Sequence, residues 1–321
     1  MKVSQERILE ISQETGFRPD VIEKVVYLLT LLNALNSHPF LKGRWALKGG
    51  TALNLFVLNI PRLSVDIDLN YIGAIDRETM MEERPKVEQA VQDVFSREGV
   101  NVKRIPAEHA GGKWRLTYSS ALAPSGNLDV DLNFMFRQPL WDIEVRDSHA
   151  LGAYQAKSIP MVELHELAAG KLAALFSRRQ ARDIFDAHQA LQQNNLVKDK
   201  LRLAFVVYGA MNRKDWRTIS LDDVSCDIDD LRQKLIPVMK GRDISNSSEE
   251  SPLGEQLVGE CKKSLSMVYP LKAHEIQYLD YLLDKGEIEP ELLTEDSGLQ
   301  ERIKRHPMLL WKVLNVRKNF K

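Results

Sequence analysis

Two short segments of the chain alternate strictly between apolar and polar residues, a pattern typical of β-strands with one buried face. They span residues 65–71 and 128–134. Successive side chains of a strand point to opposite faces, so each segment gathers its polar residues on one side. The two polar faces carry the same residue types in the same order, namely Asp66, Asp68 and Asn70, and then Asp129, Asp131 and Asn133.

The first alternating segment predicts a metal site. Asp66 and Asp68 repel each other on a shared strand face unless a cation lies between them. Their oxygen ligands suit Mg²⁺, which usually binds one or two carboxylates together with substrate phosphates. Taken alone, such a pair is also common on a solvated sheet edge, and the same alternative holds for the second segment.

A glycine pair precedes this strand and predicts a phosphate-binding turn. Residues 45–48 are expected to form a short strand, and an apolar run at 51–58 is expected to form a helix. Gly49 and Gly50 lie between them, where backbone N–H groups can approach an anion closely. Thr51 follows at the helix start. A plain turn is the alternative interpretation of the glycine pair.

The combination resembles the nucleotidyltransferase superfamily, and more narrowly the AbiEii/AbiGii toxin family, which includes the MenT toxins. The resemblance rests on the segments 48–53 and 62–68, which contain the glycine pair and the Asp-x-Asp motif. It implies a third carboxylate on a neighbouring strand, since metal-assisted transfer uses two cations roughly 3.5–4 Å apart. Asp131 is the first choice for this ligand and Asp129 the reserve. Arg62 and Ser64 are expected to lie near the same phosphates.

A lysine on a later helix is a further candidate. Residues 163–176 predict an amphipathic helix, and Lys171 falls within its apolar stripe. Such a lysine can extend along the apolar surface to reach water. The resembled family has a helical lysine followed by an Arg-Asp-x-x-Asp segment, which Lys171, Asp183 and Asp186 match. The plainer alternatives are that Asp183 complements a helix dipole and that Asp186 pairs with Arg182.

Composition limits the classes of ligand and the cellular setting that the chain can have. The chain has 321 residues with 44 lysines and arginines against 45 acidic residues, so nucleic-acid contact must come from local basic patches. Its two cysteines, Cys226 and Cys261, lie far apart, which excludes a cysteine zinc cluster. No segment reaches the roughly 20 apolar residues of a membrane span. A cytoplasmic protein without membrane contact is expected.

The expected organisation is an α/β nucleotidyltransferase fold with a small mixed sheet, followed by an α-helical region. Residues 1–44 are expected to form N-terminal helices, 45–160 the catalytic core, and 161–321 a helical region that completes the active site. The later helices are expected at 197–211, 221–240, 254–268, 271–285 and 306–319. A polar linker is expected at 242–252. The C-terminal segment from 302 to 321 mixes basic residues with Trp311 and Phe320, typical of a solvated face or of RNA contact.

The resemblance implies a metal-dependent enzyme that uses Mg²⁺ or Mn²⁺ and a nucleoside triphosphate. It would release pyrophosphate and attach a nucleoside monophosphate to an acceptor, commonly the 3′ end of tRNA, under the restraint of a cognate antitoxin. Asp66, Asp68, Asp131, Lys171 and Asp186 would be catalytic, and Gly49, Gly50, Thr51, Arg62, Ser64, Lys171 and Asp183 would bind the nucleotide. The alternatives are a protein or small-molecule acceptor, or a non-catalytic nucleotide-binding module of the same fold.

Overall fold

The computed structural model describes residues 3–105, 111–241 and 250–319. The chain divides into two compact units, which we call the sheet unit and the helical unit. The sheet unit comprises Met1–Arg137, Ile143–Val162 and Ile236–Asp243. The helical unit comprises Gln138–Asp142, Glu163–Leu235 and Ile244–Lys321. The N-terminal helices therefore share a unit with the strands, and the domain boundaries expected from the sequence stay a prediction.

The sheet unit is built on one mixed seven-stranded sheet with the order β3-β4-β5-β2-β1-β7-β6. Its strands are β1 (Trp45–Lys48), β2 (Asp66–Tyr71), β3 (Asn101–Ile105), β4 (Gly111–Tyr118), β5 (Gly126–Asn133), β6 (Glu144–Arg146) and β7 (Ile159–Met161). Neighbouring strands run antiparallel except β2 with β5 and β1 with β7, which are parallel. This confirms the predicted mixed sheet and the strands expected at 45–48, 65–71 and 128–134.

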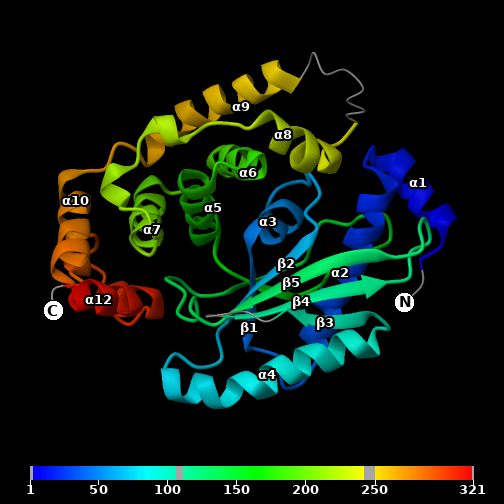
Figure 1. Cartoon of the computed structure of the whole chain (residues 1–321), viewed down its shortest axis with the longest axis horizontal. Helices are drawn as coiled ribbons and strands as arrows, with labels where there is room; N and C mark the ends of the chain where they lie inside the picture. The colour runs from blue at the N-terminus through cyan, green and yellow to red at the C-terminus, as the bar shows by residue number, and fades with distance from the viewer. Residues whose placement is uncertain (1–2, 106–110, 242–249, 320–321) are drawn as a thin grey trace. The chain divides into compact units, whose positions relative to one another are not determined.

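Helices α1 (Gln5–Thr15), α2 (Pro19–Ser37) and α4 (Arg77–Arg97) complete this unit together with α3 (Gly49–Ala52), which continues as a π-helical turn over Leu53–Val57. The apolar face of the sheet packs against α2 and α4 through aromatic pairs. Tyr118 stacks on Tyr27 of α2, and Trp114 meets Phe95 of α4 edge to face. Helix α4 lies on one side of the strands and α3 on the other (Figure 1). The polar strand face is therefore turned away from α2 and α4.

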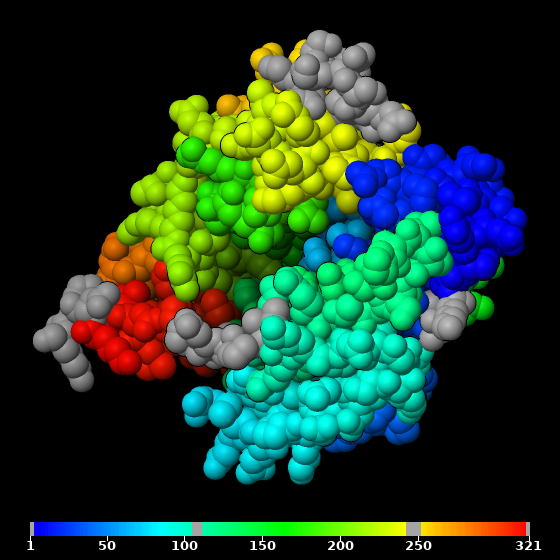
Figure 2. Space-filling view, turned by 45° about the vertical axis from the view of Figure 1, so that its right-hand side comes forward, coloured from blue at the N-terminus to red at the C-terminus, as the bar shows by residue number. Residues whose placement is uncertain are grey.

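Strands β4 and β5 also contribute to the molecular surface. In the space-filling view their turquoise and green atoms border the cyan atoms of α4 (Figure 2). Along β5 the buried residues Leu128, Val130 and Leu132 alternate with half-buried polar residues. Because a strand exposes every second side chain on one face, the aspartates of this strand lie on the face that α2 and α4 leave uncovered.

The helical unit contains α5 (Leu164–Arg178), α6 (Ala181–Leu191), α7 (Lys198–Ala210), α8 (Ile228–Asp230), α9 (Glu250–Ser264), α10 (Ala273–Asp280), α11 (Ser297–Lys304) and α12 (Pro307–Asn319). Its core includes a cluster of three aromatic rings, Phe176, Phe205 and Trp216. Helix α5 ends at Arg178, and the left-handed backbone of the next residue, Arg179 (φ 48°), turns the chain into α6. No helix within the described part of the chain is long and apolar enough to cross a membrane.

One predicted helix is wrong. Residues 221–240 do not form one continuous helix: a turn at Leu221–Asp223 is followed, after residues 224–227, by consecutive helical turns at Ile228–Asp230, Leu231–Leu235 and Ile236–Val238. Ser220 and Asp227 each cap a new helical start with their side chains, and Pro237 lacks the N–H that a longer helix needs. Strands β6 and β7 and helix α11 were not predicted. The expected linker at 242–252 falls largely outside the described residues, as does Phe320.

Candidate active site

The two alternating segments lie side by side in the sheet. Strands β2 and β5 pair in parallel, and the register joins residue to residue: Asp66 with Asp129, Asp68 with Asp131 and Asn70 with Asn133. Paired residues of neighbouring strands point to the same face. The structure therefore brings four aspartates onto one surface, opposite the face that packs against α2 and α4.

A row of four charged residues crosses this face. Lys48 of β1 pairs with Asp68, and Lys113 of β4 pairs with Asp131, so the row reads lysine, aspartate, aspartate, lysine across four strands. Among the residues that the structure describes, none of these four side chains forms a hydrogen bond or an ion pair. Burial raises the pKa of Asp131, Asp68 raises it further, and Lys48 and Lys113 oppose the rise. The row thus places two positive and two negative charges side by side without a direct ion pair between them.

Asp129 differs from Asp131 in having a partner. Arg115 of β4 donates two hydrogen bonds to its carboxylate, with N–O distances of 2.9 and 3.1 Å. This bidentate pair is the main reason that the pKa of Asp129 is lowered. A carboxylate held in this way is less available to a cation than Asp131, which favours Asp131 as the ligand.

The glycine turn touches the carboxylate row. Gly49 has a φ of +73°, and a β-carbon added to it would lie 2.3 Å from Oδ2 of Asp68. Only glycine meets both requirements, because other residues are strained at positive φ and would collide with the carboxylate. Thr51 is fully buried and donates its hydroxyl hydrogen to the carbonyl oxygen of Asp66 over 2.5 Å. This bond ties the start of α3, including the buried Gly50, to strand β2.

Two further predicted residues lie in the segment that leads into β2. Arg62 is 2% exposed and donates to the carbonyl oxygen of Leu63 over 2.9 Å. Ser64 is also buried. Neither the hydrogen bond of Arg62 nor the burial of the two residues tests a nucleotide-binding role, so that role stays a prediction for both.

A second cluster lies in the helical unit. Lys171 of α5 forms ion pairs with Asp186, at 2.7 Å, and with Asp183, at 3.5 Å, both on α6. The Lys171 side chain is only 11% exposed, so it does not extend to water as the plainer alternative supposed. Arg178 holds Asp183 from its other side with two hydrogen bonds of 2.6 and 3.1 Å. The three residues that match the family pattern thus form one buried charge cluster.

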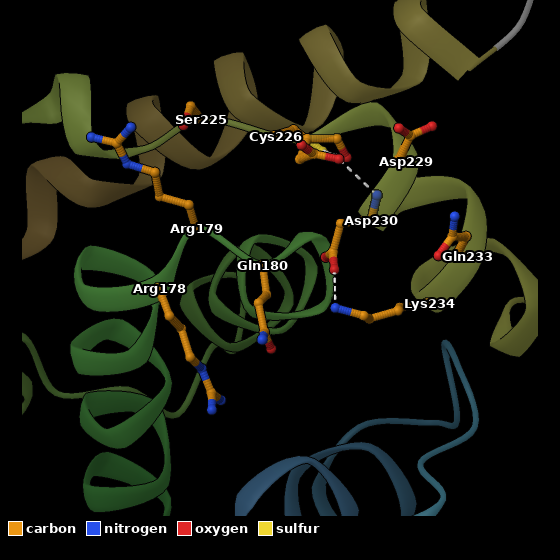
Figure 3. Close-up of a pocket in the computed structure, with 10 residues that line it drawn as sticks. Arg178, Arg179, Gln180, Ser225, Cys226, Asp229, Asp230, Gln233 and Lys234 are labelled. Carbon is orange, nitrogen blue, oxygen red and sulfur yellow. Dashed lines mark hydrogen bonds and ion pairs between the residues drawn. The ribbon is translucent and has the colours of Figure 1, made fainter.

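A surface pocket of about 610 Å³ also lies in the helical unit (Figure 3). Arg178, Arg179 and Gln180 enter it from the turn between α5 and α6. The opposite wall carries Asp230 in an ion pair with Lys234. Its three basic residues are matched by three aspartates, Asp227, Asp229 and Asp230. The mixed charge does not mark it as a phosphate site.

Sequence reasoning missed the roles that Lys48 and Lys113 take in the charge row. Lys48 directly precedes the glycine pair, but no sequence pattern assigned it a function. Lys113 and Arg115 alternate with buried Trp114 and Leu116, so their shared face was visible in the sequence. What the sequence lacked was the register that sets β4 beside β5.

Comparisons with known proteins identify a family and a similar fold. The family described as the nucleotidyl transferase AbiEii toxin of type IV toxin–antitoxin systems matches residues 30–258. Among solved structures, MenT4, a nucleotidyltransferase toxin from Mycobacterium tuberculosis, is similar over 96% of this chain and 99% of that chain. The TM-score is 0.65 and the sequence identity 15%, so this likeness shows a shared fold. No curated protein matches the sequence. The family match spans most of the chain, which therefore belongs to the AbiEii nucleotidyltransferase toxin family.

Proposed function

We propose that this protein is a metal-dependent nucleotidyltransferase that moves a nucleoside monophosphate from a nucleoside triphosphate to the 3′ end of tRNA and releases pyrophosphate. The observation that carries the proposal is the parallel register of β2 and β5, which sets Asp68 beside Asp131 with Gly49 against the carboxylate of Asp68. The proposed setting is the cytoplasm, where a cognate antitoxin would restrain the activity.

The residues present fit Mg²⁺ or Mn²⁺. Asp66, Asp68 and Asp131 would hold the cation, and Asn70 adds an amide oxygen that is buried without a hydrogen-bond partner among the described residues. No group of three or more acidic, histidine or cysteine side chains in the described ranges is arranged to hold a metal alone. The carboxylates would therefore need water and substrate phosphates to complete the coordination, as is usual for Mg²⁺. When bound, the cation would neutralise charge on the phosphates and the attacking oxygen.

The chain's own groups would mainly position the reactants. Phosphoryl-type transfer depends on alignment and charge neutralisation, so no covalent protein nucleophile is needed. Gly49, Gly50 and Thr51 would let the backbone approach the triphosphate. Lys171 would supply a positive charge to the same phosphates, and Asp186 and Asp183 would hold that lysine in place. Arg62 and Ser64 complete the proposed nucleotide site.

The acceptor decides between this proposal and its alternatives. We would incubate the protein with Mg²⁺, total RNA and each of the labelled nucleoside triphosphates in turn, and separate the products on a denaturing gel. Label on RNA of tRNA size supports the proposal. Label on a protein or small molecule would move the assignment to another acceptor, and binding without any transfer would indicate a non-catalytic module.

A further inference from the structure

We infer that the two lysines at the ends of the charge row serve different substrates: Lys48 binds the donor triphosphate, and Lys113 binds a backbone phosphate of an RNA acceptor. This rests on the proposed function and names residues that it leaves unassigned. Both lysines flank the Asp68–Asp131 pair, one from β1 and the other from β4.

The charges of the row call for a ligand that carries both signs. Lys48, Asp68, Asp131 and Lys113 are partly exposed, and their side chains have no hydrogen-bond or ion-pair partner within the described residues. The neighbouring Asp129–Arg115 pair shows that this face can satisfy its charges internally when it is built to do so. A cation at the two carboxylates with phosphates on either side would satisfy all four groups of the row.

The surroundings of the two lysines differ. Lys48 directly precedes the Gly49–Gly50 turn, so it lies on the side proposed for the triphosphate. Lys113 lies on β4, and Arg115 follows it on the same face of that strand. The exposed Lys103 of β3 pairs with Arg115 and extends this face. Within the sheet unit α2 and α4 cover the opposite face of these strands.

This part of the face is net positive. Lys113, Arg115 and Lys103 contribute three positive charges, and Asp131 and Asp129, the partners of Lys113 and Arg115 on β5, contribute two negative charges. A positively charged strip that begins at the catalytic carboxylates suits the phosphates of a single strand whose end enters the site. The triphosphate donor needs no such extension, because all its phosphates are close together.

The test measures the two substrates separately. RNA binding would be followed by the anisotropy of a short fluorescein-labelled single-stranded RNA in EDTA at several NaCl concentrations. Triphosphate binding would be followed by calorimetry with Mg²⁺ and each of the nucleoside triphosphates. The variants are Lys48→Met, Lys113→Met and Lys113→Arg, with Lys86→Met as the control. Lys86 is exposed on α4, on the opposite side of the sheet, and its loss changes the net charge equally.

We expect Lys113→Met to weaken RNA binding roughly tenfold, as for loss of a charged hydrogen bond. The slope of log K against log[NaCl] should fall by roughly 0.7, the value for one phosphate contact with a single strand. Triphosphate affinity should stay the same. Lys48→Met should weaken triphosphate binding and leave RNA binding and its salt slope unchanged. Lys113→Arg should keep RNA binding, and Lys86→Met should change neither RNA nor triphosphate binding.

Equal effects of Lys48→Met and Lys113→Met on both ligands would overturn the division of roles. An unchanged salt slope in a folded Lys113→Met variant would overturn the RNA contact. If the parent protein binds triphosphate but no RNA, this inference fails while the donor half of the proposed function stands. If the parent binds neither, the proposed function itself fails.

Discussion

Replacing Lys171 by methionine separates a structural role from a catalytic one. The side chain keeps its length and apolar stem but loses the charge that pairs with Asp186, a residue with no exposed surface. Asp183 keeps its two hydrogen bonds from Arg178. The change therefore removes the lysine that the buried carboxylates of Asp183 and Asp186 share.

The structure sets the size of the expected effect. Removing one partner of a buried ion pair costs about 3–5 kcal/mol, because the remaining charge stays away from water. Total folding free energies are about 5–15 kcal/mol, so Lys171→Met should unfold at a clearly lower urea concentration. The matched control is Lys200→Met, whose partner is Glu163 at 2.8 Å and whose side chain is 30% exposed. Lys200 is more exposed than Lys171, so the loss of its pair should cost less, although its partner Glu163 is only 10% exposed.

A double variant then isolates the catalytic role. Lys171→Met combined with Asp186→Asn removes both charges, so most of the lost stability should return. Urea unfolding followed by circular dichroism gives the stability, and labelled transfer per folded molecule gives the activity. We expect the double variant to be folded and inactive. Unchanged stability in Lys171→Met would refute the buried-pair argument, and a folded, active double variant would refute a role of Lys171 in transfer.

Three other tests concern the glycine turn, the choice of the third carboxylate and a buried acid of α5, Glu166. Gly49→Ala should lower stability by about 1–2 kcal/mol from its positive φ and reduce transfer by displacing Asp68; full activity at parental stability would contradict the close approach. Asp131→Asn should abolish transfer while Asp129→Asn keeps most of it, and the reverse order would show that the reserve residue is the ligand. Burial raises the pKa of Glu166 from 4.5 to about 7, so the folded state binds this proton more tightly and its contribution to stability is lost as the pH rises through that range. The free energy of unfolding of Glu166→Gln, measured with urea, should therefore change less than that of the parent between pH 4.5 and 7, by about 3 kcal/mol. Equal pH dependence of the two proteins would contradict this.

Local patterns predicted the strands that carry the site but not how they meet. The alternation of residues 65–71 and 128–134 is enough to place their carboxylates on one face of each strand. Whether Asp68 faces Asp131 depends on the parallel register of strands far apart in the chain, which no local pattern contains. The resemblance to a family supplied that expectation, and the position of Lys113 had no such support.

The helical residues show the same limit. Periodicity placed Lys171 in a buried stripe, where extension to water is usual for a lysine without a partner. Its partner, Asp186, comes from the next helix, so only the packing of α5 on α6 reveals the ion pair. The failed helix at 221–240 has a local cause instead. Ser220, Asp227 and Pro237 each signal a break, and these signals outweigh the apolar spacing.

The most direct test of the central claim is thermal unfolding of the parent protein and of Asp68→Asn, each with and without Mg²⁺ and triphosphate. The parent should gain stability when both ligands are present, because they bind the folded state. Without metal, Asp68→Asn should melt at the same or a higher temperature, since one of two facing carboxylates has lost its charge. The variant should gain nothing from Mg²⁺ and triphosphate. A variant that is stabilised by Mg²⁺ and triphosphate as strongly as the parent would contradict the proposed metal site.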